Sequence, residues 1–287
     1  MTRCARPTLS DTNRALPGSA KQSESKVNFH PDWLVPQWPA PTHVHAVCTT
    51  RKGGQSLAPY AGFNLGDHVG DDAGAVEANR SQLAQALGAQ PVFLSQVHGA
   101  QVEQIFKYSL LGTPADGCIT GEPGVACTIM VADCLPVLLT NAQGSLVAAA
   151  HAGWRSLAGQ GGRGILEQVI GSFRALAPVD KAPVATEIIA WLGPCIGPEA
   201  FEVGAEVQAA FVAQDPAARA LFRPHGEGKW LADLQGLARL RLQALGVSQI
   251  YGNDGTRNWC TVSNPSRFFS HRRDRISGRM AACIWLD

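Results

Sequence analysis

Short apolar runs that end at a histidine or a cysteine form the main pattern along this chain. Three such runs, each typical of a buried strand, cover residues 92–97, 125–133 and 146–150 and lead to His98, Cys134 and His151. The third run continues into a glycine-rich loop and then into a helical pattern that starts at Ile165. In α/β proteins, strand, polar side chain, loop and helix in this order often build a site at the carboxyl ends of strands.

Helical and strand patterns alternate along the rest of the chain. Asp72 and Gly88 are typical caps around residues 73–87, where Val76, Leu83 and Leu87 share one face. Further helices are predicted from Pro198 through Phe211 and over residues 231–245. Other strands are predicted over residues 44–50, 102–106, 135–140, 187–192, 249–251 and 280–286. The turn at residues 141–144 predicts a hairpin, and hairpins mixed with crossover helices indicate one mixed α/β domain.

Composition and charge exclude several classes of protein. The chain has 287 residues and is 45% hydrophobic, which is enough for a sizeable core. Its 24 basic and 23 acidic residues give a net charge of +1, so charge does not favour a nucleic acid or an anionic membrane as a partner. No apolar run approaches the roughly 18 residues of a spanning helix. We therefore expect a cytoplasmic, monomeric protein.

The first 28 residues differ from the rest in composition. They are rich in serine, arginine, threonine and lysine, with few aromatic side chains, and they lack the apolar segment of a secretory signal. Such a segment cannot bury enough apolar surface to order itself. The sequence predicts a disordered tail over residues 1–28 and a single domain over residues 29–287.

The residues at the ends of the three apolar runs suggest a metal site. Two imidazoles and one thiolate, from His98, Cys134 and His151, match the three protein ligands of a catalytic zinc with an open fourth position. The alternative is that both histidines are hydrogen-bonded core residues and the cysteine is inert. Their long spacing matches no local zinc motif, so the sequence leaves both interpretations open.

Other motifs point less specifically to a functional site. Gly159-x-Gly161-x-x-Gly164 matches the dinucleotide fingerprint in form, but seven residues separate it from the preceding strand. Arg155, close to that loop, remains a candidate for anion binding, as does Arg51, whose neighbouring glycines would let a ligand approach the backbone. Arg272-Arg273, flanked by Asp274, is interpreted as a surface ion-pair cluster, and His43-x-His45 as a solvated strand edge.

Seven ordered motifs over residues 43–286 resemble the laccase-domain family, also called the multicopper polyphenol oxidase or peptidoglycan-editing-factor family. They are Thr49-Thr50-Arg51-x-Gly53-Gly54, Asn64-Leu65-Gly66-x-His68-Val69-Gly70-Asp71, Ser95-Gln96-Val97-His98-Gly99, Ala132-Asp133-Cys134-Leu135-Pro136, His151-Ala152-Gly153-Trp154-Arg155, Gly193-Pro194-Cys195-Ile196-Gly197 and Phe269-Ser270-His271-Arg272-Arg273-Asp274. The family commonly has tyrosine where this chain has His271, so the resemblance assigns that residue no role.

The resemblance implies a layered α/β/β/α fold with a central cleft in which His98, Cys134 and His151 hold zinc. It also implies a purine nucleoside phosphorylase that cleaves adenosine, inosine, guanosine and 5′-methylthioadenosine with phosphate, and that has adenosine deaminase activity. The nucleoside would bind beside the metal, near Arg51, Asn64 and His68, which match family motifs. Phosphate would bind Arg51 or Arg155.

Two alternatives come from other classes of function. One is a copper polyphenol oxidase, as an older family name suggests, with copper in place of zinc. A trinuclear copper centre is built from several His-x-His pairs, however, and this chain has one such pair among eight histidines. The other alternative is a non-catalytic, zinc-stabilised protein that acts in quality control of peptidoglycan precursors.

Overall fold

Two stacked sheets form the centre of the fold. The computed structural model describes residues 1–2, 29–176 and 187–287. The first sheet has the order β1-β13-β5-β2 and consists of Val44–Cys48, Met280–Leu286, Val125–Val131 and Gln90–Phe93. The second has the order β12-β8-β6-β7-β4-β3 and consists of Gln249–Gly252, Ile188–Leu192, Leu135–Asn141, Val147–Ala152, Gly117–Thr120 and Val102–Gln104. Both contain parallel and antiparallel pairs, which confirms the predicted mixed α/β class.

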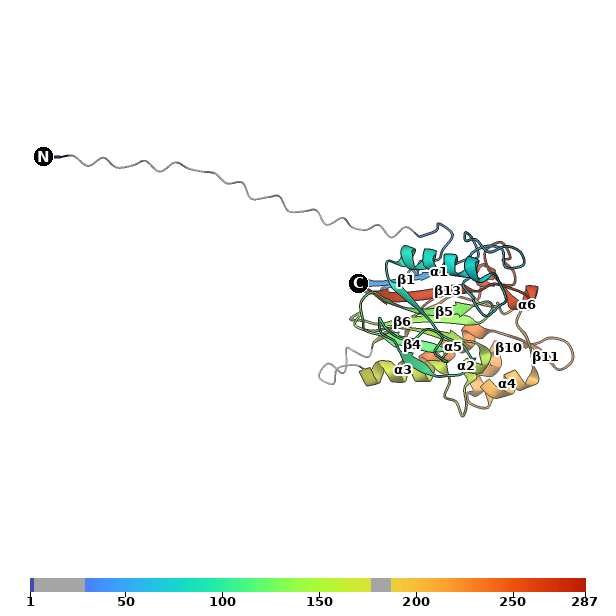
Figure 1. Cartoon of the computed structure of the whole chain (residues 1–287). Coiled ribbons are helices and arrows are strands. Elements are labelled where there is room, and N and C mark those ends of the chain that lie inside the picture. Colours follow the sequence, from blue (N-terminus) through green and yellow to red (C-terminus); the bar gives the residue numbers. More distant parts are fainter. Residues whose placement is uncertain (3–28, 177–186) are drawn as a thin grey trace.

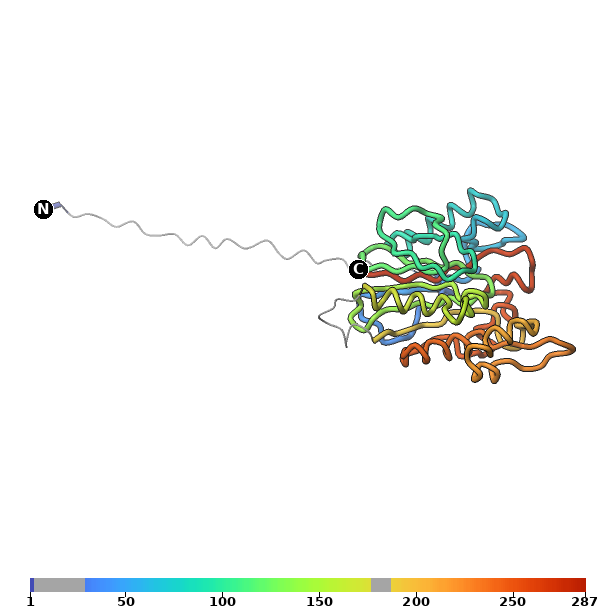
Figure 2. The backbone as a smooth tube through the Cα atoms, turned by 90° about the horizontal axis from the view of Figure 1, so that it is seen from below, coloured from blue at the N-terminus to red at the C-terminus, as the bar shows by residue number. Residues whose placement is uncertain are grey.

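Helices cover the outer faces of both sheets (Figure 1). Helix α1 (Ala73–Leu87) packs on the first sheet, whereas α3 (Ile165–Leu176) and α5 (Leu234–Ala244) pack on the second. Figure 2, turned to view the second sheet from its helical side, shows α3 in yellow-green and α5 in orange. The order of layers is therefore α/β/β/α, as the family resemblance implied.

Each boundary between layers has its own apolar cluster. Leu83 and Trp285 belong to the cluster under α1, and Phe173 belongs to the one under α3 and α5. Between the sheets, Ile129 of β5 and Leu138 of β6 belong to a third cluster. All seven residues of both β5 and β6 are buried, because each strand faces a neighbouring layer on both sides. This double burial explains why these strands read as continuous apolar runs.

Several predicted elements are confirmed. The Asp72 side chain accepts a hydrogen bond from the Ala75 amide at 2.8 Å, and Gly88 ends α1 with a φ of +62°. Strands β6 and β7 form the predicted antiparallel hairpin, in which Val137 lies opposite Ala150. The prediction of a single domain over residues 29–287 stays a prediction, and the predicted tail over residues 1–28 falls almost entirely outside the described residues.

Two helix predictions were wrong at their N-terminal ends. Residues 202–204 form β9 (Glu202–Gly204), and α4 (Ala205–Val212) begins only afterwards. Residues 229–232 form β11 (Lys229–Ala232), and the side chain of Asp233 caps α5 by accepting the Gly236 amide at 2.6 Å. The reason is long-range pairing, because β9, β11 and β10 (Phe222–Pro224) form a third small sheet.

Three shorter segments also differ from prediction. The strand before His98 ends at Phe93, and the residues up to His98 form a loop. The glycine-rich loop after His151 contains the short helix α2 (Trp154–Ala158). The basic loop near the C-terminus contains α6 (His271–Asp274). Two 3-10 helices, η2 (Pro216–Leu221) and η3 (Arg257–Trp259), complete the described elements.

The described helices have no candidate for a membrane span. None of them combines the length and the apolar character that crossing a bilayer requires.

Candidate metal centre

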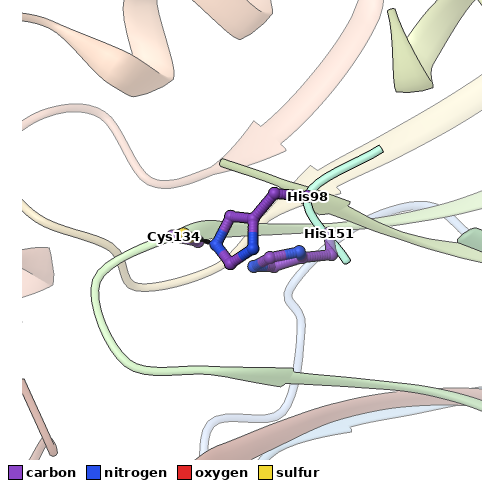
Figure 3. A group of neighbouring side chains, drawn as sticks. All are labelled: His98, Cys134 and His151. Carbon is purple, nitrogen blue, oxygen red and sulfur yellow. Dashed lines mark hydrogen bonds between the residues drawn. The ribbon is translucent and has the colours of Figure 1, made fainter. Parts of the chain in front are cut away.

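Three side chains from distant parts of the chain converge at one end of the two sheets. His98 lies in the loop after β2, Cys134 in the turn from β5 to β6, and His151 near the end of β7. Figure 3 shows the three side chains pointing toward one another, and their potential ligand atoms all lie within 4.8 Å of one another. Cys134 Sγ is 3.8 Å from His98 Nε2. The convergence supports the metal-site interpretation over two isolated core histidines.

A buried carboxylate, Asp116, positions two of these side chains. Its Oδ1 accepts a hydrogen bond from His151 Nδ1 at 2.8 Å, which directs the other ring nitrogen, Nε2, away from Asp116. Its two oxygens also accept the backbone N–H groups of Val97, His98 and Gly99 at 3.1, 2.9 and 2.7 Å. Carboxylate partners of this kind fix the tautomer and orientation of metal-bound imidazoles. Asp116 therefore ties the His98 loop to the His151 ring.

The sequence analysis missed Asp116. It is completely buried, although carboxylates are almost never fully buried without partners. In the sequence, Asp116 is an acidic residue between Ala115 and the apolar start of β4. An acidic residue that is buried at such a position needs hydrogen-bond partners for its carboxylate, but the sequence does not name them.

A second buried carboxylate, Asp133, holds the turn that carries Cys134. Its side chain accepts the Thr261 hydroxyl and the Arg272 amide, both at 2.6 Å, and its carbonyl accepts the Ile196 amide at 2.9 Å. The backbone of Asp133 has a φ of +92°, which is unusual for a residue with a side chain. The contacts to three separate segments keep this conformation in place, so the Cys134 thiol is presented from a fixed turn.

Gly153 makes room for the cluster. A Cβ atom at this position would lie 3.0 Å from Cys134 Sγ and 3.2 Å from His98 Cδ2. Its φ of −65° is accessible to any residue, so glycine is needed here for space and not for backbone conformation. The glycine after His151 therefore lets three ligand-bearing segments approach one another.

The electrostatics of the cluster favour an ionised thiol. Burial alone would raise the pKa of Cys134, but the charge of His151 and hydrogen bonds from both histidines outweigh it and lower that pKa to about 6. Burial opposes protonation of His151, whereas Cys134 and Asp116 favour it and raise the pKa of His151 to about 9. Both shifts favour a thiolate beside an imidazolium near neutral pH. A metal ion held by both the Cys134 thiolate and His151 Nε2 would take the place of the proton on that nitrogen.

The three side chains lie in a cavity of about 360 Å³ that has both apolar and cationic linings. The apolar part consists of Met130, Ala132, Trp154, Ile196, Phe201 and Leu234. The basic side chains are His68, His271, Arg272, Arg275 and Arg279. The acidic residue in the lining, Asp133, accepts hydrogen bonds from the Thr261 hydroxyl and the Arg272 amide, and among the described residues none of the three arginines forms an ion pair. This combination suits a flat apolar ring together with an anion.

Two of the other predicted site residues are connected to this cavity. His68 lines it, and burial together with the charge of Arg279 lowers the pKa of His68. Asn64 is fully buried and does not line the cavity. Its Oδ1 accepts the amides of Gly66 and Arg279 at 2.9 and 2.8 Å, which joins the His68 loop to the segment that carries Arg279.

The two arginines predicted to bind phosphate lie outside the cavity. Arg51 donates hydrogen bonds to the carbonyls of Pro265 and Ala61 at 3.0 and 3.2 Å, and its guanidinium stacks 4.7 Å from the Phe269 ring centroid. Arg155 stacks on Trp154 and lines a neighbouring, more open depression that also contacts His98. Arg51 therefore contacts two loop segments and Arg155 lies beside the candidate metal site, and phosphate binding by either arginine stays a prediction.

The remaining motifs are distributed as follows. Arg273 pairs with Asp274 at 2.6 Å, as predicted, whereas Arg272 lines the cavity together with His271. His43 and His45 have separate partners, the Gly144 carbonyl and the Asp287 carboxylate. The loop of the discounted dinucleotide motif follows helix α2 and not a strand.

Comparisons with known proteins agree with this geometry. A purine nucleoside phosphorylase of Haemophilus influenzae is 46% identical over 88% of this chain and 99% of the relative. A purine nucleoside phosphorylase of Escherichia coli, YfiH, is 48% identical over 88% of this chain and 98% of the relative. The crystal structure of Neisseria meningitidis protein NMB0706 matches with a TM-score of 0.79 and 45% identity, over 89% of this chain and 99% of that one. Residues 45–287 match the family described as multi-copper polyphenol oxidoreductase laccase. The predicted resemblance is confirmed, and the chain belongs to this family.

Proposed function

We propose that this chain is a zinc-dependent purine nucleoside phosphorylase. Its substrates would be adenosine, inosine, guanosine and 5′-methylthioadenosine, and its products the free base and ribose 1-phosphate or methylthioribose 1-phosphate. The observation that carries the proposal is the combination, in one cavity, of three converging candidate metal ligands, apolar side chains and three arginine side chains. The names of the relatives at 46–48% identity support the same reaction.

The donor set suits zinc. A tetrahedral zinc with one sulfur and two nitrogen ligands needs donor atoms about 3.5 Å apart, given metal–ligand distances of about 2.0–2.3 Å. Cys134 Sγ and His98 Nε2 are 3.8 Å apart, and Asp116 leaves the His151 Nε2 lone pair available. With three protein ligands the fourth position stays open, as in catalytic zinc sites. When bound there, zinc supplies Lewis-acid stabilisation of negative charge and activates water for hydrolysis near neutral pH.

The residues that line the cavity would bind the two substrates of phosphorolysis, the nucleoside and phosphate. In this reaction a phosphate oxygen forms a bond to the ribose C1′ while the bond from C1′ to the purine nitrogen breaks, and the base departs with the electron pair and takes up a proton. Trp154 and Phe201 provide apolar surface for the purine, and Arg272, Arg275 and Arg279 provide positive charge for the phosphate. Holding the nucleoside and the phosphate in one cavity orients them for the reaction and so increases its rate.

Adenosine deaminase activity is part of the same proposal. Deamination at the purine C6 position is a hydrolysis that needs activated water but no phosphate. Both activities would depend on His98, Cys134 and His151, whereas only phosphorolysis would depend on the arginines.

A copper polyphenol oxidase is the second candidate, and the family's description favours it. In the described residues, the set of His98, Cys134 and His151 is the one group of three or more metal-ligating side chains close enough to share an ion. His43 and His45, the pair in the His-x-His motif, point to separate partners. A blue absorption band and phenol oxidation after copper loading would support this candidate against the phosphorylase.

Replacement of Cys134 by alanine is expected to abolish stoichiometric zinc binding, because two imidazoles alone hold zinc weakly. The purified wild-type protein should contain about one zinc per chain, measured by plasma mass spectrometry. Cys48→Ala is the control, since Cys48 is another free thiol, buried and outside the cavity. Full zinc occupancy in Cys134→Ala would contradict the three-ligand assignment.

Gly153→Ala is expected to weaken zinc binding about tenfold or more without unfolding the protein, because the new Cβ would crowd Cys134 and His98. Competition with a chromophoric chelator measures the affinity. Gly171→Ala is the control: a Cβ there meets nothing within 4 Å, and alanine inside helix α3 should stabilise the fold by about 0.5–1 kcal/mol. Equal zinc affinities in the two variants would show that space at Gly153 is not limiting.

Phosphate is expected to separate the two proposed activities. With phosphate, adenosine should yield adenine and ribose 1-phosphate, whereas without phosphate it should yield inosine only, since deamination needs no phosphate. His151→Ala should impair both reactions, because both depend on the metal. Chromatography of the products, with Cys48→Ala as a control, makes this test. Base release that does not require phosphate would identify a hydrolase instead.

A further inference from the structure

Three residues other than glycine have a positive φ angle in the described part of the chain, and all three line the metal cavity. They are His98, Asp133 and Arg275, with φ values of +60°, +92° and +62°. Such conformations are strained for residues with a side chain, and they cluster at functional sites when the surrounding structure maintains them. His98 is a metal ligand and Asp133 precedes one, so both have a function that explains the strain. Arg275 has none yet.

The backbone of Arg275 is held in a γ-turn of the strained, positive-φ type. Its φ and ψ are +62° and −59°, and the Ile276 amide donates to the Asp274 carbonyl at 2.7 Å across the turn. The Arg275 amide in turn donates to the His271 carbonyl at 2.9 Å, at the end of α6. This turn is rare because the side chain crowds its own backbone. Glycine would fit it without strain, so the arginine side chain is the feature to explain.

The guanidinium of Arg275 has no partner among the described residues. Arg272 donates to the Glu202 carbonyl at 3.0 Å, and Arg279 donates to the carbonyls of Ser277 and Gly278 at 2.8 and 3.1 Å. In contrast, the Arg275 side chain makes no hydrogen bond, ion pair or ring contact with any described residue, so its five N–H donors stay available within this part of the chain. It lines the same cavity as the three metal ligands.

From these observations we propose that Arg275 binds the phosphate co-substrate, with Arg272 and Arg279 adding charge nearby. The inference rests on the proposed phosphorolysis and deepens it by naming the phosphate-binding residue. A guanidinium offers two parallel donors to a phosphate oxyanion, which gives both affinity and orientation. The strained turn places an arginine without a side-chain partner among the described residues in the cavity that also holds the candidate metal ligands.

Two ligands could supply the phosphate oxyanion that Arg275 binds. One is free inorganic phosphate, to which we commit, and the other is the 5′-phosphate of a nucleoside monophosphate. Both present a phosphate oxyanion to a guanidinium, but in the second case the oxyanion is attached to a nucleoside. The experiment therefore compares inorganic phosphate and adenosine 5′-monophosphate on the same variants.

The test compares the zinc-loaded wild-type enzyme with Arg275→Ala, Arg275→Lys, Arg275→Gly and the control Arg219→Ala. Arg219 is an exposed arginine of η2 outside the cavity, so its removal changes the net charge equally. Arg275→Ala should raise the KM for phosphate about tenfold or more, because a hydrogen bond to a charged group is lost. The KM for inosine should change little, Arg275→Lys should restore part of the loss, and Arg219→Ala should match the wild type.

A binding measurement that needs no turnover accompanies the kinetics. Inorganic phosphate should raise the melting temperature of the wild type and of Arg219→Ala, but not that of Arg275→Ala or Arg275→Gly. Arg275→Gly should itself melt above Arg275→Ala, because glycine relieves the strained turn. It also keeps the test available if the alanine variant fails to fold.

The outcomes separate this inference from the proposed function. An unchanged KM for phosphate and an unchanged phosphate-induced melting shift in Arg275→Ala and Arg275→Gly would overturn the role of Arg275. Loss of binding to adenosine 5′-monophosphate alone, with phosphate binding intact, would overturn the commitment to free phosphate. A wild type that binds phosphate through Arg275 but cleaves no nucleoside with it would contradict the phosphorylase and leave the binding assignment supported.

Discussion

The buried carboxylate of Asp116 is the interaction on which the site depends. It accepts three consecutive backbone amides of the His98 loop and the Nδ1–H of His151, so one side chain places two candidate metal ligands that lie 53 positions apart in sequence. A buried carboxylate without these partners would be strongly destabilising. The hydrogen bonds therefore satisfy the carboxylate and fix the ligands at the same time. This explains why His98 holds a φ of +60° in a loop outside any strand.

The stacked sheets place the third ligand against this pair. Strand β5 belongs to the first sheet and β6 to the second, so the turn that carries Cys134 crosses from one sheet to the other. His151 lies on β7, the hairpin partner of β6, where it faces Pro136 in the register. Asp133 then joins this crossing to the segments of Ile196, Thr261 and Arg272. The cavity is thus bounded by segments that the two sheets and these hydrogen bonds keep in place.

Much of this arrangement follows from local sequence signals. Runs that are apolar on both faces identify the buried strands β5 to β8, and Asp72 and Gly88 mark both ends of α1. The convergence of His98, Cys134 and His151 was foreseeable because each follows or ends such a run. Long-range features were not predictable. The small sheet of β9, β10 and β11 depends on pairing between distant segments, and it converted residues with a helical pattern into strands. Asp116 and Arg275 act through partners or a turn that no local pattern encodes.

The central claim is that Asp116 sets the ligand geometry of a zinc site formed by His98, Cys134 and His151. X-ray absorption spectroscopy at the zinc edge, on the wild type and on Asp116→Ala, tests it most directly. For the wild type, the account predicts one sulfur at about 2.3 Å and two imidazole nitrogens at about 2.0–2.1 Å. For Asp116→Ala, it predicts that the sulfur remains and that imidazole scattering decreases. The same coordination shell in both proteins, or a wild-type shell without sulfur, would contradict the account.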